Sequence, residues 1–223
     1  MSEVNTSPGS SRAVLLLIAG IPLTMILAAS WLWYFVVEGD LDLVGALGTA
    51  NHGTLVQPPR QIVDIPFTDD AGARFRWTDV EPRWTMLVVN RGETCDQQCE
   101  RRLYTTRQIH IALGKEFNRV RRVMLSDQRV DQVTVQLPDG PTEGVPEGAP
   151  ADLPGFVAQA HNGLLLLSTA PEPMDDIAAE WDQDTAQWYL VDPAGWVMMR
   201  FSDDLSYKDI IKDLKFLLKN SGG

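Results

Sequence analysis

The alternation of apolar and polar residues divides the chain into one long apolar segment and a series of short ones. The segment Ala13–Val37 contains no ionisable residue. At about 1.5 Å per residue, a helix of this length crosses a hydrocarbon layer of about 30 Å. Aromatic residues gather near its end, at Trp31, Trp33 and Tyr34, as they do at membrane interfaces. We therefore predict a transmembrane helix over Ala13–Val37.

The charges that flank this segment predict its orientation. Arg12 precedes it and the acidic stretch Glu38–Asp42 follows it, and positive residues are retained in the cytoplasm. Residues 1–12 are therefore expected to form a cytoplasmic tail. A cleaved signal peptide is the alternative, because Ala28–Ser30 resembles a cleavage site, although the apolar run is longer than a secretory core.

A polar stretch follows, and then the pattern changes. Residues 38–60 are punctuated by Pro and Gly and are expected to be a tether, with His52 as a surface residue. From Gln61 onward, short apolar runs alternate with turn signals. The run Ile62–Phe67 and the turn-prone Asp69–Gly72 together predict a small hairpin.

The next three elements predict a β-α-β unit. Trp84–Asn90 is a continuous apolar run, typical of a strand buried on both faces. A helix is expected over about Asp96–Gly114, with Gly114 as its end. Val120–Ser126 has the pattern of a second strand in the same sheet, reached by a right-handed crossover.

The remaining third of the chain predicts a loop, three strands and a helix. Residues 127–162 include the Pro- and Gly-rich stretch Leu137–Pro150, which we expect to be a mobile loop of no assignable role. Leu164–Ser168 reads as a buried strand, and Trp188–Phe201 as a hairpin around a D-P-A-G turn. Tyr207–Lys219 is an amphipathic helix.

The order β-α-β, β-hairpin, α matches the core of the thioredoxin fold. The predicted fold class is therefore α/β, a thioredoxin-like domain over residues 61–223 with one N-terminal transmembrane helix. The formal net charge is −11, which repels nucleic acid and anionic lipid and favours cationic proteins or metal ions. A nucleic-acid function is excluded.

The two cysteines of the chain, Cys95 and Cys99, lie where the first buried strand leads into its helix. Oriented N–H groups and the helix dipole stabilise a thiolate there, so Cys95 is expected to have a lowered pKa and to be the more reactive thiol. Their spacing suits a disulfide or one soft metal ion. A structural disulfide would stabilise little, because the closed loop is short.

Several motifs together resemble a known family. The strand W-T-M-L-V-V-N, the C-x-x-x-C turn, R-V-M-L-S and the late Y-L-V-D-P-A-G resemble the Sco-type proteins of cytochrome c oxidase assembly. The runs N-H-G-T-L-V-Q-P-P and L-Y-T-T-R-Q-I-H-I-A-L-G-K-E are similar to uncharacterised proteobacterial membrane proteins associated with cytochrome oxidase genes. The resemblance implies a single-pass protein of the bacterial inner membrane with its domain in the periplasm.

The resemblance also implies copper binding by two cysteines and a distal histidine. Cys95 and Cys99 match the motif, but Asp184 stands roughly where the histidine is expected, and a carboxylate is a poor ligand for copper(I). His110 lies nearly three helical turns beyond the cysteines. His161 is a weak candidate for a third ligand, approaching from the loop.

Three functions remain open. The first is a thiol-disulfide oxidoreductase that keeps the copper-binding cysteines of an oxidase subunit reduced, with Cys95 attacking and Cys99 resolving. The second is a copper(I) carrier that uses both cysteines and an unidentified third ligand. The third is a non-catalytic assembly factor with a structural disulfide. The expected partners are a membrane-bound oxidase subunit or other assembly factors. Gln187 stands where thioredoxins have a cis-proline, so an ordinary thioredoxin is not expected.

Overall fold

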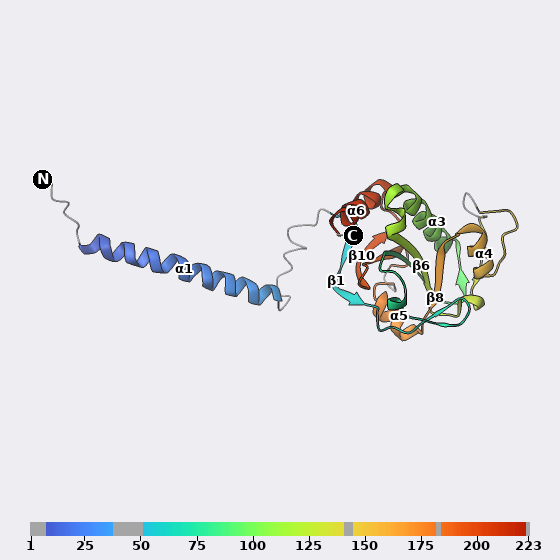
Figure 1. Ribbon diagram of the computed structural model, residues 1–223, viewed down its shortest axis with the longest axis horizontal. Helices are drawn as coiled ribbons and strands as arrows, with labels where there is room; N and C mark the ends of the chain where they lie inside the picture. Colours follow the sequence, from blue (N-terminus) through green and yellow to red (C-terminus); the bar gives the residue numbers. More distant parts are fainter. Residues whose placement is uncertain (1–7, 38–50, 141–144, 182–183, 222–223) are drawn as a thin grey trace. The chain divides into compact units, whose positions relative to one another are not determined.

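The computed structural model describes residues 8–37, 51–140, 145–181 and 184–221 (Figure 1). The chain divides into two compact units, residues 1–50 and residues 51–223. Residues 1–7 of the expected tail and residues 38–50 of the expected tether lie outside the described residues.

The first unit holds one helix, α1 (Pro8–Val37), which contains the whole segment for which the sequence predicts a helix. Large apolar side chains along α1, including Leu16 and Trp33, are exposed. In the part of the chain that the structure describes, no helix combines the length and the apolar character needed to cross a membrane. The predicted span over Ala13–Val37 is therefore not confirmed.

The second unit is built on an eight-stranded sheet. Its strands, in spatial order, are β1 (Thr54–Gln61), β10 (Trp196–Ser202), β9 (Gln187–Val191), β4 (Trp84–Asn90), β6 (Val120–Ser126), β8 (Leu164–Ser168), β2 (Phe67–Asp69) and β3 (Arg74–Phe75). The neighbouring strands β4, β6 and β8 are parallel, and every other pairing in the sheet is antiparallel.

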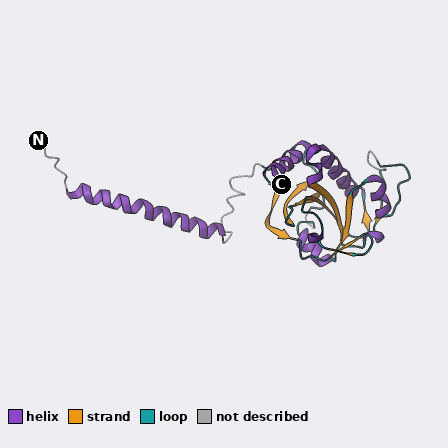
Figure 2. Cartoon of the chain, in the orientation of Figure 1, coloured by secondary structure: helices purple, strands orange, loops and turns teal. Residues whose placement is uncertain are grey.

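Helices cover both faces of this sheet (Figure 2). The helices α3 (Gln97–Ala112), α4 (Leu153–Ala160) and α6 (Tyr207–Asn220) contribute to one core, and α5 (Pro171–Ile177) contributes to the other. Along β4, Met86 and Val88 face the first core, whereas Leu87 and Val89 face the second. Burial on both faces is why β4 is a continuous apolar run.

The predicted β-α-β unit is confirmed. β4 and β6 pair in parallel from Trp84 opposite Val120 to Asn90 opposite Ser126, and α3 is the crossover. The early hairpin is present, but its first strand is β2 (Phe67–Asp69) and not the predicted run Ile62–Phe67. β2 and β3 pair around a turn in which the Asp69 carboxylate accepts two backbone N–H groups. The late hairpin of β9 and β10 and the final helix occur as predicted.

The predicted tether is wrong over its second half. Thr54–Gln61 forms β1, which pairs with β10 at the edge of the sheet, so the second unit begins at Asn51 rather than at Gln61. An edge strand tolerates Pro58 and Pro59, which lack a donor for a further neighbour. A register shift between Leu55 and Arg60 accommodates them.

The predicted loop over residues 127–162 is more structured than expected. It contains the 3-10 helix η3 (Val130–Gln132), the short strand β7 (Thr134–Val135) and α4. α4 begins where the Asp152 carboxylate accepts the backbone N–H of Gly155, a normal N-cap contact. β7 pairs in parallel with β5 (Thr94–Cys95), which brings this segment to the cysteine motif.

Candidate functional site

The cysteine motif occupies the turn between β4 and α3. β4 ends at Asn90, the chain turns, and Cys95 ends the short strand β5. Asp96 is the N-cap of α3, so Cys95 precedes the helix and Cys99 is its third residue. The two cysteines are joined by a disulfide with an S–S distance of 2.00 Å and a Cα–Cα distance of 5.2 Å.

The Asp96 carboxylate uses the donors that would stabilise a thiolate. Its Oδ1 accepts the backbone N–H of Gln98 at 3.1 Å and of Cys99 at 2.9 Å. Unpaired N–H groups at a helix start lower a thiol pKa, whereas a neighbouring carboxylate acts in the opposite direction. The helix start therefore favours a Cys95 thiolate less than the bare motif indicates.

The backbone of Cys95 is fixed by the segment that contains β7. The Cys95 carbonyl accepts the N–H of Gln136 at 2.9 Å, and Cys95 stands opposite Val135 in the β5–β7 pair. The side chain of Gln97 reaches the same segment and donates to the carbonyl of Gly140 at 3.1 Å. The segment after β6 therefore covers the disulfide turn.

Both cysteines are shielded from solvent. Cys95 is 0% exposed and Cys99 is 1% exposed, and both belong to the core beneath α3. Because exchange with another thiol requires a collinear approach to a sulfur atom, a partner can react only after part of this cover moves. The cover is the feature that controls access to the pair.

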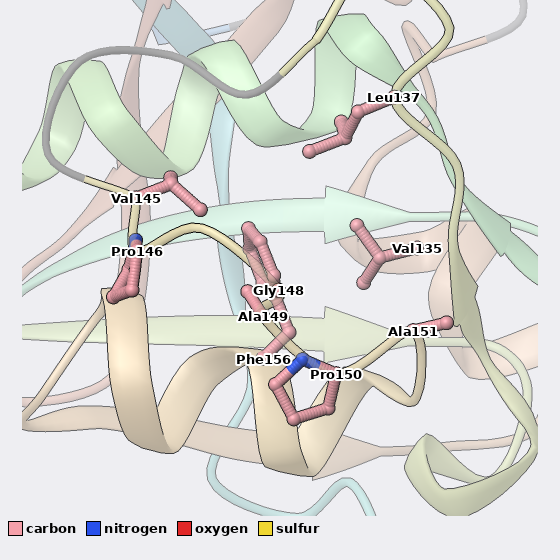
Figure 3. Close-up of a pocket in the computed structure, with 9 residues that line it drawn as sticks. All are labelled: Val135, Leu137, Val145, Pro146, Gly148, Ala149, Pro150, Ala151 and Phe156. Atoms are coloured by element: carbon pink, nitrogen blue, oxygen red, sulfur yellow. The ribbon is translucent and has the colours of Figure 1, made fainter.

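An apolar hollow of about 210 Å³ lies against the covering segment (Figure 3). Val135 of β7, Leu137 and the buried ring of Phe156 line it, together with prolines at positions 146 and 150. No residue that lines the hollow carries a charge. Residues from the segment 145–151 therefore line this hollow together with Val135, the residue that stands opposite Cys95.

His161 does not lie beside the cysteines. Arg107 donates to the carbonyl of Ala160, and Arg107 is eight residues beyond Cys99 on α3, a distance of about 12 Å along the helix. The His161 side chain is fully buried, and neither ring nitrogen has a hydrogen-bond partner among the described residues. Burial, and secondarily the charges of Arg107 and Arg122, lower the His161 pKa to about 3.

The other two histidines have structural contacts. The His110 ring stacks on Phe117 at 3.8 Å, and its Nε2 lies 2.9 Å from the carbonyls of Phe117 and Val120; burial lowers its pKa. His52 is not a free surface residue as expected, because its Nδ1 lies 2.9 Å from the Asp213 carboxylate of α6. Neither histidine is brought to the cysteine turn.

Asp184 stabilises its own loop. Its carboxylate accepts the N–H of Ala186 at 2.9 Å. The same loop is held to α3 by Arg102, a residue that sequence reasoning missed. Arg102 is 2% exposed, donates to the carbonyl of Thr185 and stacks on Trp181 at 5.1 Å. The sequence feature that could have identified Arg102 is its position one helical turn after Cys99, on a helix with a buried face.

Gln187 faces away from the cysteines. Its side chain is buried and bonds to the Tyr189 hydroxyl at 3.1 Å, on the opposite face of the sheet from Cys95 and Cys99. The cis peptide bond found in the described residues joins Gln57 to Pro58, in β1. Position 187 therefore has neither the proline of thioredoxins nor the cis peptide bond that precedes it.

The described residues do not bring together enough ligand side chains to form a metal site. Within the described ranges, no group of three or more His, Cys, Asp or Glu side chains could hold a metal ion. The cysteines are oxidised to a disulfide, and thiolates rather than disulfides bind metal. The predicted copper ligation by Cys95 and Cys99 remains a prediction without a third ligand.

Solved structures share this fold. Yeast Sco1 with copper bound is 13% identical, with a TM-score of 0.51, and the match covers 78% of this chain and 97% of that chain. A second yeast Sco1 structure is 12% identical, with a TM-score of 0.52, and the match covers 75% and 99%. The thioredoxin-like fold expected from the resemblance to Sco-type proteins is thereby confirmed. No curated protein matches the sequence.

The sequence also matches a described family. The matched residues are 84–147 and 146–221, which include the cysteine turn, the parallel strands and α6 and amount to more than half of the chain. The chain therefore belongs to the family described as the transmembrane-like, thioredoxin-like, C-terminal domain.

Proposed function

We propose that this chain is a membrane-anchored thiol-disulfide protein that assists assembly of the copper centre of cytochrome c oxidase, with Cys95 and Cys99 as its redox pair. The observation that supports this most is the disulfide itself, closed at the strand-to-helix turn of a fold shared with yeast Sco1. The oxidase role rests on the likeness to Sco proteins.

The proposed reaction starts from the reduced protein. The Cys95 thiolate attacks one sulfur of a client disulfide, and the other client sulfur leaves as a thiolate that takes up a proton. Cys99, as thiolate, then attacks Cys95 Sγ and expels the second client thiolate. Two electrons pass to the client, and the protein is left as the disulfide seen here. A dithiol donor must reduce it for another cycle.

A structural disulfide in a non-catalytic assembly factor is the second candidate. The shielding of both sulfurs favours it. Its contribution to stability would be small. The two cysteines are only four residues apart, and closing so short a loop raises the free energy of unfolding by about 2 kcal/mol. Copper(I) carriage has less support, because no third ligand is found in the described residues.

Anchoring to the bacterial inner membrane, with the domain in the periplasm and residues 1–12 in the cytoplasm, is part of the proposal. It is supported by the uncharged stretch Ala13–Val37 and by the exposure of the large apolar side chains along α1. Carbonate extraction of membranes from expressing cells tests it, since an anchored chain stays in the pellet.

Trapping of a mixed disulfide tests the redox role. In a Cys99→Ser variant the resolving thiol is lost, so Cys95 should accumulate as a reductant-sensitive adduct with an oxidase subunit. The matched Cys95→Ser variant should give no adduct. If neither variant traps a partner and both complement a deletion strain, the redox pair plays no part in assembly. Anaerobic titration of the reduced protein with copper(I) tests the copper(I)-carrier hypothesis, which tight one-to-one binding would favour.

A further inference from the structure

Every lysine of this acidic chain lies on one surface of the second unit. The chain has five lysines, Lys115, Lys208, Lys212, Lys215 and Lys219. Four are on α6, and Lys115 lies just beyond α3 in the 3-10 helix η2 (Gly114–Arg119). α3 and α6 lie side by side on one face of the sheet (Figure 1). We call this surface the lysine face.

The lysines of α6 form a straight stripe. Their spacings are four, three and four residues, which align side chains along one side of a helix. All four are exposed, while Ile210, Leu214 and Leu218 are buried beneath them. Phe216, which lies four residues after Lys212 and three before Lys219, is 61% exposed. The stripe therefore presents cations around an exposed aromatic ring.

A hollow between the two helices completes the lysine face. It has a volume of about 540 Å³ and is lined by Lys115, Lys215 and Lys219 and by apolar atoms of Leu113. Ile111, one helical turn before Lys115, is 59% exposed. Ammonium groups beside exposed apolar side chains match a surface in which anionic headgroups lie above hydrocarbon.

The acidic residues of the same region are engaged elsewhere. Asp209 and Asp213 of α6 contact His52 rather than the lysines. Glu116, at the rim of the hollow, bonds to Arg119 at 3.0 Å. Among the described residues, the ammonium groups of the stripe thus have no carboxylate within ion-pair distance. Lys115, which lies outside the stripe on the same face, is 3.9 Å from Glu116.

The chain enters the second unit at this helix. The backbone N–H groups of His52 and Gly53 both donate to Asp213 on α6, at 2.7 and 2.9 Å. Only the fourteen residues 38–51 separate the end of α1 from His52, and a chain of that length can reach at most about 50 Å. A membrane that holds α1 is therefore within reach of the helix that carries the stripe.

We propose that the lysine face docks on the anionic phospholipid headgroups of the membrane that anchors the chain. The proposal rests on the membrane anchoring proposed above. Elsewhere the acidic surface is repelled by the same headgroups, which turns α6 toward the bilayer. Docking fixes the orientation of the domain above the bilayer and leaves the disulfide turn, at the start of α3, away from the docked end of that helix.

Amine labelling of the full-length chain in lipid nanodiscs tests the proposal. Because the chain has no lysine elsewhere, acylation followed by peptide mass spectrometry measures this face directly. In discs rich in phosphatidylglycerol, labelling should be roughly five- to tenfold slower than in discs of phosphatidylcholine alone. The protection should disappear at about 1 M salt, where the Debye length falls to about 3 Å.

Charge-reversed variants provide the control. Lys212→Glu/Lys219→Glu should abolish the protection of the three remaining lysines in anionic discs. Arg74→Glu/Arg76→Glu, which makes the same charge change at exposed positions on β3 and just after it, should keep it. Equal labelling in both kinds of disc, as expected if the face binds an acidic protein instead, overturns the docking while leaving the anchor intact. A chain that does not enter the discs overturns both.

Discussion

The Nδ1 atom of His52 lies 2.9 Å from the Asp213 carboxylate, across 161 residues of sequence. A carboxylate can only accept, so the imidazole donates. Oδ2 of Asp213 accepts two further bonds, from the backbone N–H groups of His52 and Gly53. A single buried carboxylate thus joins the first residues of the second unit to its last helix.

Asp213→Ala should lower the free energy of unfolding by about 2–4 kcal/mol, because it leaves the part-buried N–H of His52 and the buried N–H of Gly53 without an acceptor. Urea denaturation measures the loss. The matched variant Asp209→Asn alters the half-exposed contact between Asp209 and His52 and should cost less than about 1 kcal/mol. Equal effects of the two variants would contradict the role assigned to the buried carboxylate.

Asp96→Asn should make the Cys95 thiol more acidic in the reduced protein. Asparagine keeps the N-cap contact but removes a negative charge one residue from Cys95, which lowers the pKa of the Cys95 thiol. Alkylation rates as a function of pH measure this, and they should also show Cys95 reacting at lower pH than Cys99. Asp131→Asn, at an exposed ion pair, should leave the alkylation profile unchanged.

Gln136→Pro should speed reduction of the disulfide. Proline removes the N–H that bonds to the Cys95 carbonyl and suits the extended conformation of the preceding Val135. We expect dithiothreitol to reduce this variant several-fold faster than the parent chain. Gln136→Ala retains the N–H and should react at the parental rate. An unchanged rate in the proline variant would mean that the β7 segment does not limit access.

His161 should make stability depend on pH. Its pKa is lowered to about 3, against about 6.5 in the unfolded chain, so the unfolded state binds the proton more readily. Stability is therefore unaffected by this group above about pH 6.5 and is lost as the pH falls toward 3, with a slope of at most about 1.4 kcal/mol per pH unit. His161→Phe should be stabilised relative to the parent at pH 5 more than at pH 8. A constant difference between the two chains in urea denaturation would refute the assignment.

The strands of the central sheet could be predicted because burial on two faces demands unbroken apolar runs, as in Trp84–Asn90. β1 was missed because the consecutive prolines Pro58 and Pro59 are more typical of a linker than of a strand, although an edge strand tolerates them. The helices α4 and α5 were missed because each is at most eight residues long and begins with a proline near its start, which reads locally as a turn.

The candidate site was predictable in its residues and not in its surroundings. The spacing of Cys95 and Cys99 indicated that a disulfide could form, and Asp96 is a recognisable N-cap. The backbone of Cys95 is bonded by Gln136, which is 41 residues away in sequence and reaches it beside the β5–β7 pair. His161 fails as a neighbour for a similar reason, since the topology leaves it beside Arg107, midway along α3.

The cover over the disulfide slows its exchange with thiols in solution. Small thiols and oxidants that diffuse through an oxidising compartment reach a buried sulfur slowly, because reaction rates depend on access as well as on driving force. With Cys95 at 0% exposure, the oxidation state of the pair is kinetically insulated from its surroundings. The protein can therefore remain out of equilibrium with the bulk thiol pool, and under the redox role proposed above the pair would exchange only with a partner that opens the cover.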